Sequence, residues 1–462
     1  MTLPPPPQNI FRAYDIRGKY GSEINAETAR QIGKAFVSFI IDRYEIQHPR
    51  IVVGRDNRTH GKELQKAFIG GLMEHGARVS LLEDSTSPML YFAVCEGNYD
   101  AGVNVTASHN PAEYNGFKLV GREAHSICGA EIQTIKQMIF DQQFAAESIG
   151  TMEEIMIEEN YYEKISSIIN LTKPLKIVLD AANGIAGKHY PELFRRLGCE
   201  VIELYCDQDG KFPNHEPDPV VEANTEDLKS AVLENKADLG ISFDGDGDRC
   251  AIVDEQGKYH DANESFVLLI RDILSRHPGS SVVYTVSNSL IVPEEIKSNG
   301  GIPKMVPVGH SHVEVAMHET KAPLGGEQSG HFFLAENYYG FDDAAYTSAK
   351  LLEIFSKTNE PVSSSYATIP LVYSKPEFRP FCADDQKFKV IENLAQELGQ
   401  SYRCNTMDGV RVEFDDGAWL GIRASNTSPC VSVCMEAKDS KRLEEVFELA
   451  KESLRKHQIE VE

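Results

Sequence analysis

Short apolar runs alternate with amphipathic segments along most of this chain. Residues 49–84 read PRIVVGRDNRTHGKELQKAFIGGLMEHGARVSLLED, in which an apolar run, a polar turn, a segment of helical period and a second apolar run follow one another. Residues 175–207 and 280–309 repeat this order. Short apolar runs favour strands, and apolar positions at the helical period favour helices. The pattern therefore predicts three related α/β domains in tandem, whose strands are joined by crossover helices.

The pattern changes after about residue 368. A predicted helix near 385–399 precedes SYRCNTMDGVRVEFDDGAWLGIRASNTSPCVSVCMEA, where alternation and DG turns indicate antiparallel strands. A final amphipathic helix is predicted near 440–456. The expected fold class is α/β, with domains at 1–153, 154–254, 255–368 and 369–462. The first three are mixed α/β domains of shared topology, and the last is α+β.

Composition is that of an ordinary soluble globular protein. Of the 462 residues, 41% are hydrophobic and 25% are charged, and no run of 18 apolar residues occurs that could span a bilayer. The opening MTLPPPPQN lacks the basic and apolar regions of a secretion signal, so a cytoplasmic location is expected. The nine cysteines are odd in number and form no CxxC pair, which predicts reduced, mostly buried thiols rather than a disulfide framework or zinc cluster.

Charge narrows the class of ligand. The net charge of −24 repels polyanions, so nucleic acid is a poor partner, and no basic run compensates for it. An anionic small molecule would have to be held by a few well-placed cations and backbone amides. Attention therefore falls on isolated Arg and Lys residues in loops rich in Gly or Asn.

The most polar stretch, ISFDGDGDRCAIVD at 241–254, places three carboxylates two residues apart, on Asp244, Asp246 and Asp248. In a tight glycine-containing loop these can converge into a hard oxygen site for Mg²⁺ or Ca²⁺. The spacing also fits an EF-hand, with Glu255 at its last position, but Arg249 stands where that loop needs glycine. The flanking segments moreover predict strands rather than helices. Arg249 indicates a second anionic partner beside the metal.

Two further loops carry ligand-binding chemistry. GIRASNTSP at 421–429 combines a guanidinium, hydroxyls, an amide and backbone N–H groups, a set that suits a phosphate monoester, although a plain turn remains an alternative. GGEQSGH at 325–331 offers an acid, an amide, a hydroxyl and an imidazole between glycines. Paired donors and acceptors of this kind recognise vicinal hydroxyls such as those of a sugar, and a surface turn is equally consistent with the segment.

The segment TASHNPAEYNGFK at 106–118 contains a serine followed directly by a histidine. The GxSxG nucleophile elbow of serine hydrolases is absent, and a histidine next in sequence is rarely placed to deprotonate its neighbour. A hydrolase is therefore disfavoured. A serine beside a metal-carboxylate loop and a phosphate-binding loop fits better as a phosphoryl carrier.

Together these segments resemble the α-D-phosphohexomutase superfamily, and within it the bacterial phosphomannomutase/phosphoglucomutase group. TASHNP, DGDGDR, GEQSGH and RASNTSP match the family's motifs in order, one in each predicted domain, and FRAYDIRG at 11–18 matches its N-terminal segment. The resemblance covers essentially the whole chain. It implies four domains around a central cleft.

The resemblance also implies an activity. Members move phosphate reversibly between the 1- and 6-positions of a hexose, through a phosphoserine and a bound hexose 1,6-bisphosphate that turns over in the site. The implied cofactor is Mg²⁺, held by Asp244, Asp246, Asp248 and a phosphoryl oxygen on Ser108. The implied partners are hexose phosphates of mannose or glucose. Charge and apolar content predict no nucleic-acid or membrane partner, and a monomer or weak homodimer is expected.

Roles follow residue by residue from the matching motifs. Ser108 would carry the phosphate, with His109 supporting it and Arg249 steadying the transferring group. Lys118 and His331 are candidate acid/base groups. The residues expected to bind substrate are Tyr14, Arg17, Asn110, His310, Glu327, Ser329, Arg423, Ser425, Asn426 and Thr427. His310 and His312 have HxH spacing, but no cysteine or carboxylate joins them, so a second metal is not expected.

Alternatives remain open at this stage. The chain departs from many relatives at Ser287, where they carry a lysine, so one expected cation on the substrate is in doubt. GEQSGH also occurs in phosphoglucosamine mutases, which makes that enzyme the second candidate, whereas TASHNPAEYNGFK and SNTSP favour mannose and glucose phosphates. A hypothesis of another class is a non-catalytic module that binds sugar phosphate or Ca²⁺.

Overall fold

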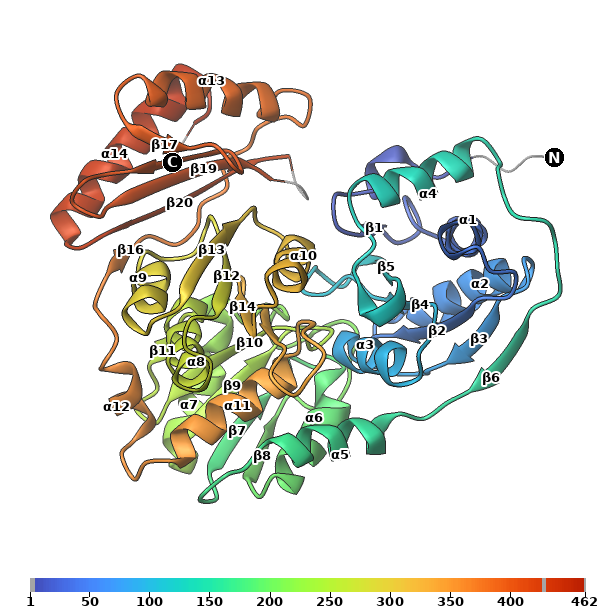
Figure 1. Ribbon diagram of the computed structural model, residues 1–462, viewed down its shortest axis with the longest axis horizontal. Coiled ribbons are helices and arrows are strands. Elements are labelled where there is room, and N and C mark those ends of the chain that lie inside the picture. Colours follow the sequence, from blue (N-terminus) through green and yellow to red (C-terminus); the bar gives the residue numbers. More distant parts are fainter. Residues whose placement is uncertain (1–4, 426–428, 461–462) are drawn as a thin grey trace. The chain divides into compact units, whose positions relative to one another are not determined.

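A computed structural model describes residues 5–425 and 429–460 of the chain (Figure 1). Two compact units form, and neither is continuous in sequence. The first comprises Met1–Leu269 and Ser329–Tyr366, and the second comprises Ile270–Gln328 and Ala367–Glu462.

The first unit begins with a six-stranded mixed sheet in the order β1-β5-β4-β2-β3-β6. Strands β2, β3, β4 and β6 run parallel, whereas β5 runs antiparallel to both β4 and β1. Helix α1 packs against α2, and α3 packs on β2 and β4. The elements are β1 (Ile16–Lys19), α1 (Ala26–Tyr44), β2 (Arg50–Arg55), α2 (Gly61–Met73), β3 (Arg78–Leu81), α3 (Ser87–Glu96), β4 (Ala101–Val105), β5 (Tyr114–Val120), α4 (Ala130–Phe140) and β6 (Thr151–Glu154).

A five-stranded sheet follows in the same unit, in the order β11-β10-β9-β7-β8. Strands β7, β8 and β9 are parallel, and the hairpin partner β10 runs antiparallel to β9. Later segments of the chain complete this unit. The elements are α5 (Glu158–Ile168), β7 (Lys176–Asp180), α6 (Ala186–Arg196), β8 (Glu200–Leu204), α7 (Glu226–Asn235), β9 (Leu239–Phe243), β10 (Cys250–Asp254), β11 (Tyr259–His260), β15 (Phe332–Leu334), α11 (Ala344–Ser356) and α12 (Val362–Tyr366).

The second unit contains parallel strands in the order β13-β12-β14 and an antiparallel sheet in the order β16-β20-β19-β18-β17. Helix α8 (Ala262–Arg276) runs from the first unit into the second. The remaining elements are β12 (Ser281–Thr285), α9 (Ile291–Ser298), β13 (Ile302–Val306), α10 (His310–Thr320), β14 (Leu324–Gly326), β16 (Tyr373–Ser374), α13 (Lys387–Gly399), β17 (Arg403–Asn405), β18 (Val410–Glu413), β19 (Trp419–Ala424), β20 (Val431–Ala437) and α14 (Ser440–Lys456).

The three predicted repeats are confirmed as one topology. In each, the first strand (β2, β7 or β12) lies between the second (β3, β8 or β13) and the third (β4, β9 or β14). The helix that follows the first strand is α2, α6 or α9. The antiparallel fourth sheet and both predicted helices beside it, α13 and α14, are also confirmed.

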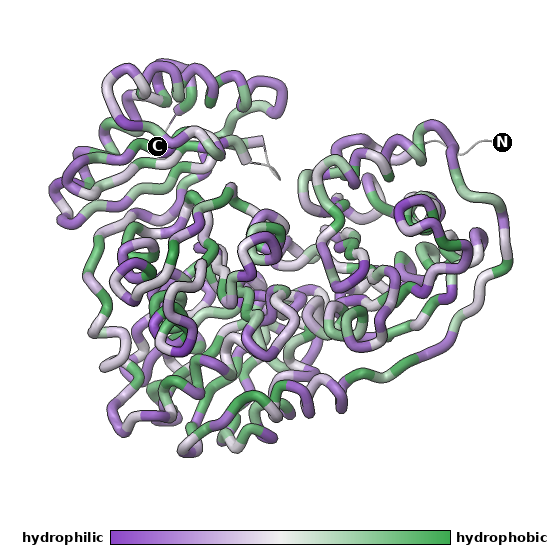
Figure 2. The backbone as a smooth tube through the Cα atoms, viewed as in Figure 1, coloured by the Kyte–Doolittle hydropathy of each residue, from purple (hydrophilic) through white to green (hydrophobic). Residues whose placement is uncertain are grey.

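Hydrophobic and hydrophilic residues alternate in short runs along the chain (Figure 2). The buried hydrophobic residues form the cores between helices and sheets. Among the described residues, no helix is both long and apolar enough to cross a membrane. All nine cysteines are free thiols, and Cys199, Cys206, Cys250, Cys382, Cys430 and Cys434 are buried, as the sequence predicts.

Candidate functional site

The loop between β4 and β5 carries Ser108 in a strained backbone conformation. Its φ is 51°, in the left-handed region that costs a non-glycine residue about 1–3 kcal/mol. Such a conformation persists only where the surroundings hold it. The Ser108 N–H donates to Thr106 Oγ1 at 2.9 Å, and the Ser108 carbonyl accepts from Arg58 Nη2 at 2.7 Å. The serine is therefore fixed on both sides of its Cα.

The loop between β9 and β10 carries the three aspartates, and all of them are fully buried. Asp244 Oδ1 accepts hydrogen bonds from the backbone N–H groups of Gly247, Asp248 and Arg249, at 2.9, 3.0 and 3.2 Å. Gly247 has a φ of 77°, which a residue without Cβ adopts at no cost. The first aspartate thus folds the loop around its own carboxylate, so that the three side chains converge.

The serine and aspartate loops meet within the first unit. Ser108 Oγ donates to Asp244 Oδ2 at 2.9 Å, although 136 positions separate the two residues. A Cβ on Gly245 would lie 2.5 Å from the Ser108 carbonyl oxygen, so only glycine permits this approach. The predicted proximity of serine and carboxylates is therefore present in the structure.

The histidine that follows the serine contacts the serine hydroxyl, but not in the arrangement of a nucleophile and its base. Ser108 Oγ lies 3.2 Å from His109 Nδ1. The left-handed backbone of Ser108 turns the two consecutive side chains toward each other. However, a hydroxyl has one proton, and Ser108 directs it to Asp244, which leaves Oγ to accept from His109 Nδ1–H.

Lys118 lies on β5 and reaches across to the aspartates. Its Nζ is 2.7 Å from Asp246 Oδ2 and also forms a hydrogen-bonded ion pair with Asp248 Oδ2. Burial lowers the pKa of Lys118, but the two carboxylates outweigh burial and raise that pKa well above its ordinary value. The amine is thus a cation in contact with the carboxylate cluster.

The aspartate cluster has the donor set of a hard-cation site. One ligand oxygen from each aspartate lies within 4.8 Å of the others. Burial is the main cause that raises the pKa of Asp244 well above its ordinary value, and the negative charges of Asp248 and Asp246 raise it further. Three carboxylates that are shielded from water repel one another strongly. Within the described part of the chain, Asp246 Oδ1 and Asp248 Oδ1 are buried without a hydrogen-bond partner. A divalent cation would satisfy both oxygens and offset the repulsion, so the residues fit Mg²⁺.

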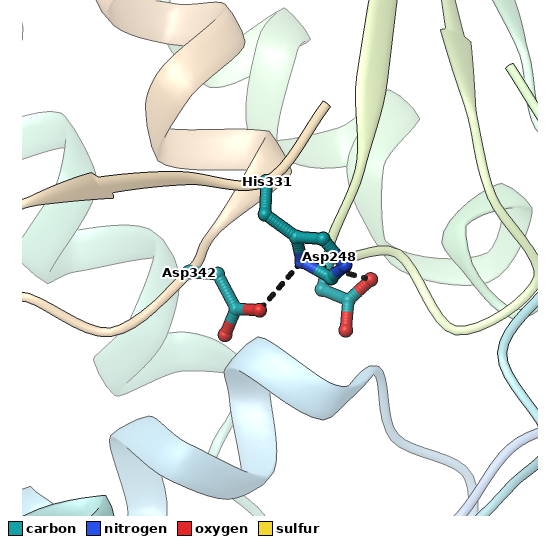
Figure 3. A group of neighbouring side chains, drawn as sticks. All are labelled: Asp248, His331 and Asp342. Atoms are coloured by element: carbon teal, nitrogen blue, oxygen red, sulfur yellow. Dashed lines mark hydrogen bonds and ion pairs between the residues drawn. The ribbon is translucent and has the colours of Figure 1, made fainter. Parts of the chain in front are cut away.

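A second chain of polar groups adjoins the cluster. Arg249 Nε donates to His331 Nε2 at 2.8 Å, and His331 Nδ1 donates to Asp342 Oδ2 at 2.7 Å. Figure 3 shows His331 between Asp342 and Asp248, whose Oδ1 is 3.9 Å from the imidazole Nδ1. A guanidinium can only donate, so Nε2 must accept and the proton of the neutral imidazole sits on Nδ1.

The N-terminal residues expected in the site lie in the same unit. Arg17 Nη1 donates to Asn110 Oδ1 at 2.7 Å, which ties the FRAYDIRG segment to the serine loop. Arg17 also pairs with Asp15. Tyr14 is half-buried, three residues before Arg17. Ser329, two residues before His331, belongs to this unit as well.

The other expected substrate-binding residues belong to the second unit. Glu327 is buried and its Oε1 accepts from the Gly309 N–H at 2.8 Å, next to His310 at the start of α10. Arg423 lies one residue before the end of β19, with its Nη2 3.8 Å from Glu377 Oε1. Ser425 N donates to the Cys430 carbonyl at 3.0 Å. Asn426 and Thr427 lie outside the described residues.

Ser287, the departure from many relatives, lies just after β12 in the second unit. It lines the same small cavity as Arg411 and Arg423. The Arg411 guanidinium donates to the carbonyls of Val286 and Asn288, on either side of Ser287. A buried cation therefore already supports the turn in which a lysine was expected.

Several polar residues of the site are not revealed by the sequence motifs. Arg58 and Asp56 lie after β2, and Asp342 lies before α11. Ser87 begins α3 and donates its hydroxyl to Asp246 Oδ2 at 2.6 Å. A signal was present in the polar turn RDNRTH at 55–60, since polar residues after a buried strand collect at the carboxyl edge of a sheet.

Comparison with family models covers nearly the whole chain. The models for phosphoglucomutase/phosphomannomutase α/β/α domains I, II and III match residues 8–146, 159–257 and 261–373. The model for the C-terminal domain of the same family matches residues 381–452.

Individual relatives agree with these matches. The chain is 40% identical over 444 residues to a phosphomannomutase/phosphoglucomutase of Pseudomonas aeruginosa, which covers 95% of this chain and 94% of the relative. It is 37% identical over 443 residues to a phosphoglucomutase of Neisseria gonorrhoeae, with 95% of each covered. Among solved structures, a phosphoglucomutase/phosphomannomutase family protein of Burkholderia thailandensis superposes with a TM-score of 0.91 at 37% identity, over 98% of both chains.

Proposed function

The chain belongs to the phosphoglucomutase/phosphomannomutase family, and on that premise we propose how its own residues carry out the family's reaction. It is an enzyme, a mutase of the isomerase class, that moves phosphate between the 1- and 6-positions of a hexose phosphate. Mutases of this family work through a phosphoserine and a bisphosphate intermediate. The observation that supports our assignment is the buried Ser108 hydroxyl, 2.9 Å from a carboxylate of the aspartate cluster.

Ser108 would carry the phosphoryl group. In the first half-reaction the bond from phosphorus to Ser108 Oγ breaks, and a bond to a substrate hydroxyl oxygen forms. The hydroxyl proton leaves to a base, and Ser108 Oγ gains a proton. The bisphosphate then reorients and returns its other phosphate to Ser108 by the reverse steps.

Asp244, Asp246, Asp248 and a phosphoryl oxygen on Ser108 would hold Mg²⁺. A bound Mg²⁺ supplies neutralisation of the charge on the transferring phosphoryl group. Arg249, 4.0 Å from Asp244 Oδ2, adds a second positive charge beside it.

Proton transfer would fall to groups close to this cluster. His331 and Lys118 are the candidates for the acid and base, since Lys118 on β5 pairs with Asp248 and His331, just before β15, has its Nδ1 3.9 Å from Asp248 Oδ1. His109 donates to Ser108 Oγ and would support the phosphoserine.

The remaining residues would bind the sugar phosphate. Glu327 and Ser329 supply an acceptor and a hydroxyl for vicinal sugar hydroxyls. Turning the sugar roughly exchanges its 3- and 4-hydroxyls, so the same pair can bind either orientation. Arg423 and Ser425, with Asn426 and Thr427 that follow in the sequence, would bind the phosphate that is not transferred. Tyr14, Arg17, Asn110 and His310 would complete the binding surface.

Intact-protein mass spectrometry tests the phosphoserine directly. Purified enzyme incubated with glucose 1,6-bisphosphate should gain one phosphate, and Ser108→Ala should gain none. The matched control is Ser167→Ala, which removes an exposed hydroxyl of α5 and should leave phosphorylation unchanged. A parent protein that never becomes phosphorylated would contradict the mechanism and favour a non-catalytic sugar-phosphate module.

We propose mannose and glucose phosphates as substrates. Comparison of kcat/KM for mannose, glucose and glucosamine 1-phosphates tests this, because selectivity is a difference in transition-state binding. A preference of about a hundredfold for the amine would favour the phosphoglucosamine mutase alternative. We also propose a cytoplasmic monomer or weak homodimer, with the nine free thiols as support for a reducing compartment.

A further inference from the structure

The buried residues Asp56 and Arg58 lie directly beneath the serine loop. Asp56 is fully buried and Arg58 is 1% exposed. Arg58 Nε donates to Asp56 Oδ2 at 3.1 Å, and the Arg58 N–H donates to Asp56 Oδ1 at 2.9 Å. The pair is thus a closed unit that leaves the two Nη groups of the guanidinium free to bind elsewhere.

Both Nη groups donate to backbone carbonyls of the serine loop and of Tyr114, the first residue of β5. Arg58 Nη2 donates to the carbonyls of Ser108 and Asn110 at 2.7 and 2.6 Å. Nη1 donates to the carbonyls of Pro111 and Tyr114 at 2.7 and 3.0 Å. With the bond to Asp56, every N–H of the guanidinium is used, in the fixed fork geometry that only arginine provides.

The carboxylate reaches the same serine from its other side. Thr106 Oγ1 donates to Asp56 Oδ2 at 2.7 Å and accepts the Ser108 N–H at 2.9 Å. The amide of Ser108 is therefore held through Thr106 and its carbonyl through Arg58. These are the two peptide groups that set the positive φ of the serine.

We propose that Asp56 and Arg58 form the positioning pair for the phosphoserine: together they hold the strained Ser108 backbone so that Oγ points at the aspartate cluster. This deepens the proposed function and rests on it. Arg58 is not a catalytic residue, because its guanidinium is buried under the loop, donates hydrogen bonds only to backbone carbonyls and Asp56, and lies 5.0 Å from the centroid of the Phe212 ring. Its loss should lower kcat and leave KM largely unchanged.

Two pairs of variants test this. Thr106→Val removes the link to the Ser108 amide at nearly constant volume, whereas Thr106→Ser retains it. Arg58→Lys keeps the charge but not the fork, and Arg55→Lys, on the same strand end and paired with Asp84, is the matched control. A misplaced nucleophile should lower kcat by about 100-fold in Thr106→Val and Arg58→Lys, with Thr106→Ser and Arg55→Lys within about threefold of the parent.

Chemical rescue separates positioning from general destabilisation. In Arg58→Ala, millimolar guanidinium should restore kcat at least about tenfold relative to the same concentration of NaCl, because the ion can occupy the vacated fork. Hydrogen exchange across residues 104–118 should be faster in Thr106→Val and Arg58→Lys than in the parent, and slowed again by guanidinium in Arg58→Ala. This readout needs no activity.

The outcomes are distinct. If the parent lacks mutase activity, the proposed function fails, and hydrogen exchange still decides the role of the pair. Unchanged kcat and unchanged exchange in Arg58→Lys and Thr106→Val would overturn the positioning role. So would a rise in KM at constant kcat, which would make Arg58 a substrate contact.

Discussion

The aspartates next to the serine loop differ in their hydrogen-bond partners, so substitution of each one should have a different effect. Asp244 Oδ1 accepts hydrogen bonds from three backbone N–H groups, and these bonds shape the loop. By contrast, Asp248 Oδ1 is buried without a hydrogen bond among the described residues. Asp246 Oδ1 is also unpaired among these residues, but Asp246 Oδ2 accepts from Ser87 Oγ at 2.6 Å, so Asp248 is the aspartate whose charge can be removed with least damage to the loop.

Asp248→Asn should weaken Mg²⁺ binding by about tenfold or more, because one hard anionic ligand becomes neutral at constant shape. Titration of activity against Mg²⁺ concentration measures the shift. Asp415→Asn, at an exposed aspartate of the second unit, is the control and should titrate as the parent does. An unaltered Mg²⁺ requirement in Asp248→Asn would remove this residue from the metal site.

Asp342→Asn should impair catalysis through His331. The carboxylate accepts from Nδ1, which fixes the tautomer that lets Nε2 accept from Arg249 (Figure 3). An amide can instead offer an N–H to Nδ1 and turn the imidazole into the other tautomer. We expect kcat to fall by about 10- to 100-fold with little change in KM, and the ¹⁵N shifts of His331 to report the tautomer. An unchanged tautomer together with a normal kcat would contradict this.

At the level of elements, the buried carboxylate that caps α11 makes a contribution to stability that depends on pH. Asp343 is the N-cap of α11 and accepts from Tyr346 N at 2.9 Å. Tyr161 and Tyr338 donate their hydroxyls to it at 2.9 Å. Burial nevertheless outweighs these hydrogen bonds and raises the pKa of Asp343 from 3.8 to about 6.

Because the folded state holds this proton more tightly than the unfolded state, the contribution of Asp343 to the free energy of unfolding is largest below about pH 4. It declines as the pH rises through about 6, by about 3 kcal/mol in all. Asp343→Asn carries no such loss, so it should gain stability relative to the parent between pH 4 and pH 7.5. Urea unfolding at both pH values measures this.

The control for that comparison is Asp439→Asn, the same change at the exposed N-cap of α14. It accounts for the loss of a capping carboxylate alone. A difference between Asp343→Asn and the parent that stays constant with pH would contradict the assignment.

The elements also show what sequence patterns can and cannot predict. Strands β2, β7 and β12 and their following helices are predictable, because each is a local run with its own period. The aspartate loop and Ser108 are predictable because all their chemistry lies within a few residues. Arg58 and Asp342 are not, because their roles come from partners such as Asn110 and His331, which only the folded chain brings near. The geometry of the contact between His109 and Ser108 was not predictable either, because it depends on a positive φ that a serine rarely adopts.

For the molecule as a whole, the four proposed metal ligands belong to one unit. Ser108, Asp244, Asp246 and Asp248 all lie in the first unit, whereas strands β16 to β20 belong to the second. Mg²⁺ at about 100 times its dissociation constant should stabilise the unit that binds it by about 2.7 kcal/mol.

Hydrogen exchange should therefore slow in residues 104–118 and 239–250 when Mg²⁺ is added, and remain unchanged in residues 431–437. Na⁺ at matched ionic strength controls for screening. Equal protection of both regions would contradict a metal site confined to the first unit.

The interrupted course of the chain through its two units has a consequence for synthesis. His331 follows its partner Arg249 by 82 positions, and the first unit is not complete until Tyr366 has been made. At about 5–20 residues per second, a ribosome needs about 4–16 seconds to translate the stretch from Arg249 to His331. During this time the aspartate loop exists without the imidazole that finally receives the guanidinium of Arg249. A nascent chain therefore cannot form these polar contacts until residue 331 has been made, well after the serine and aspartate loops.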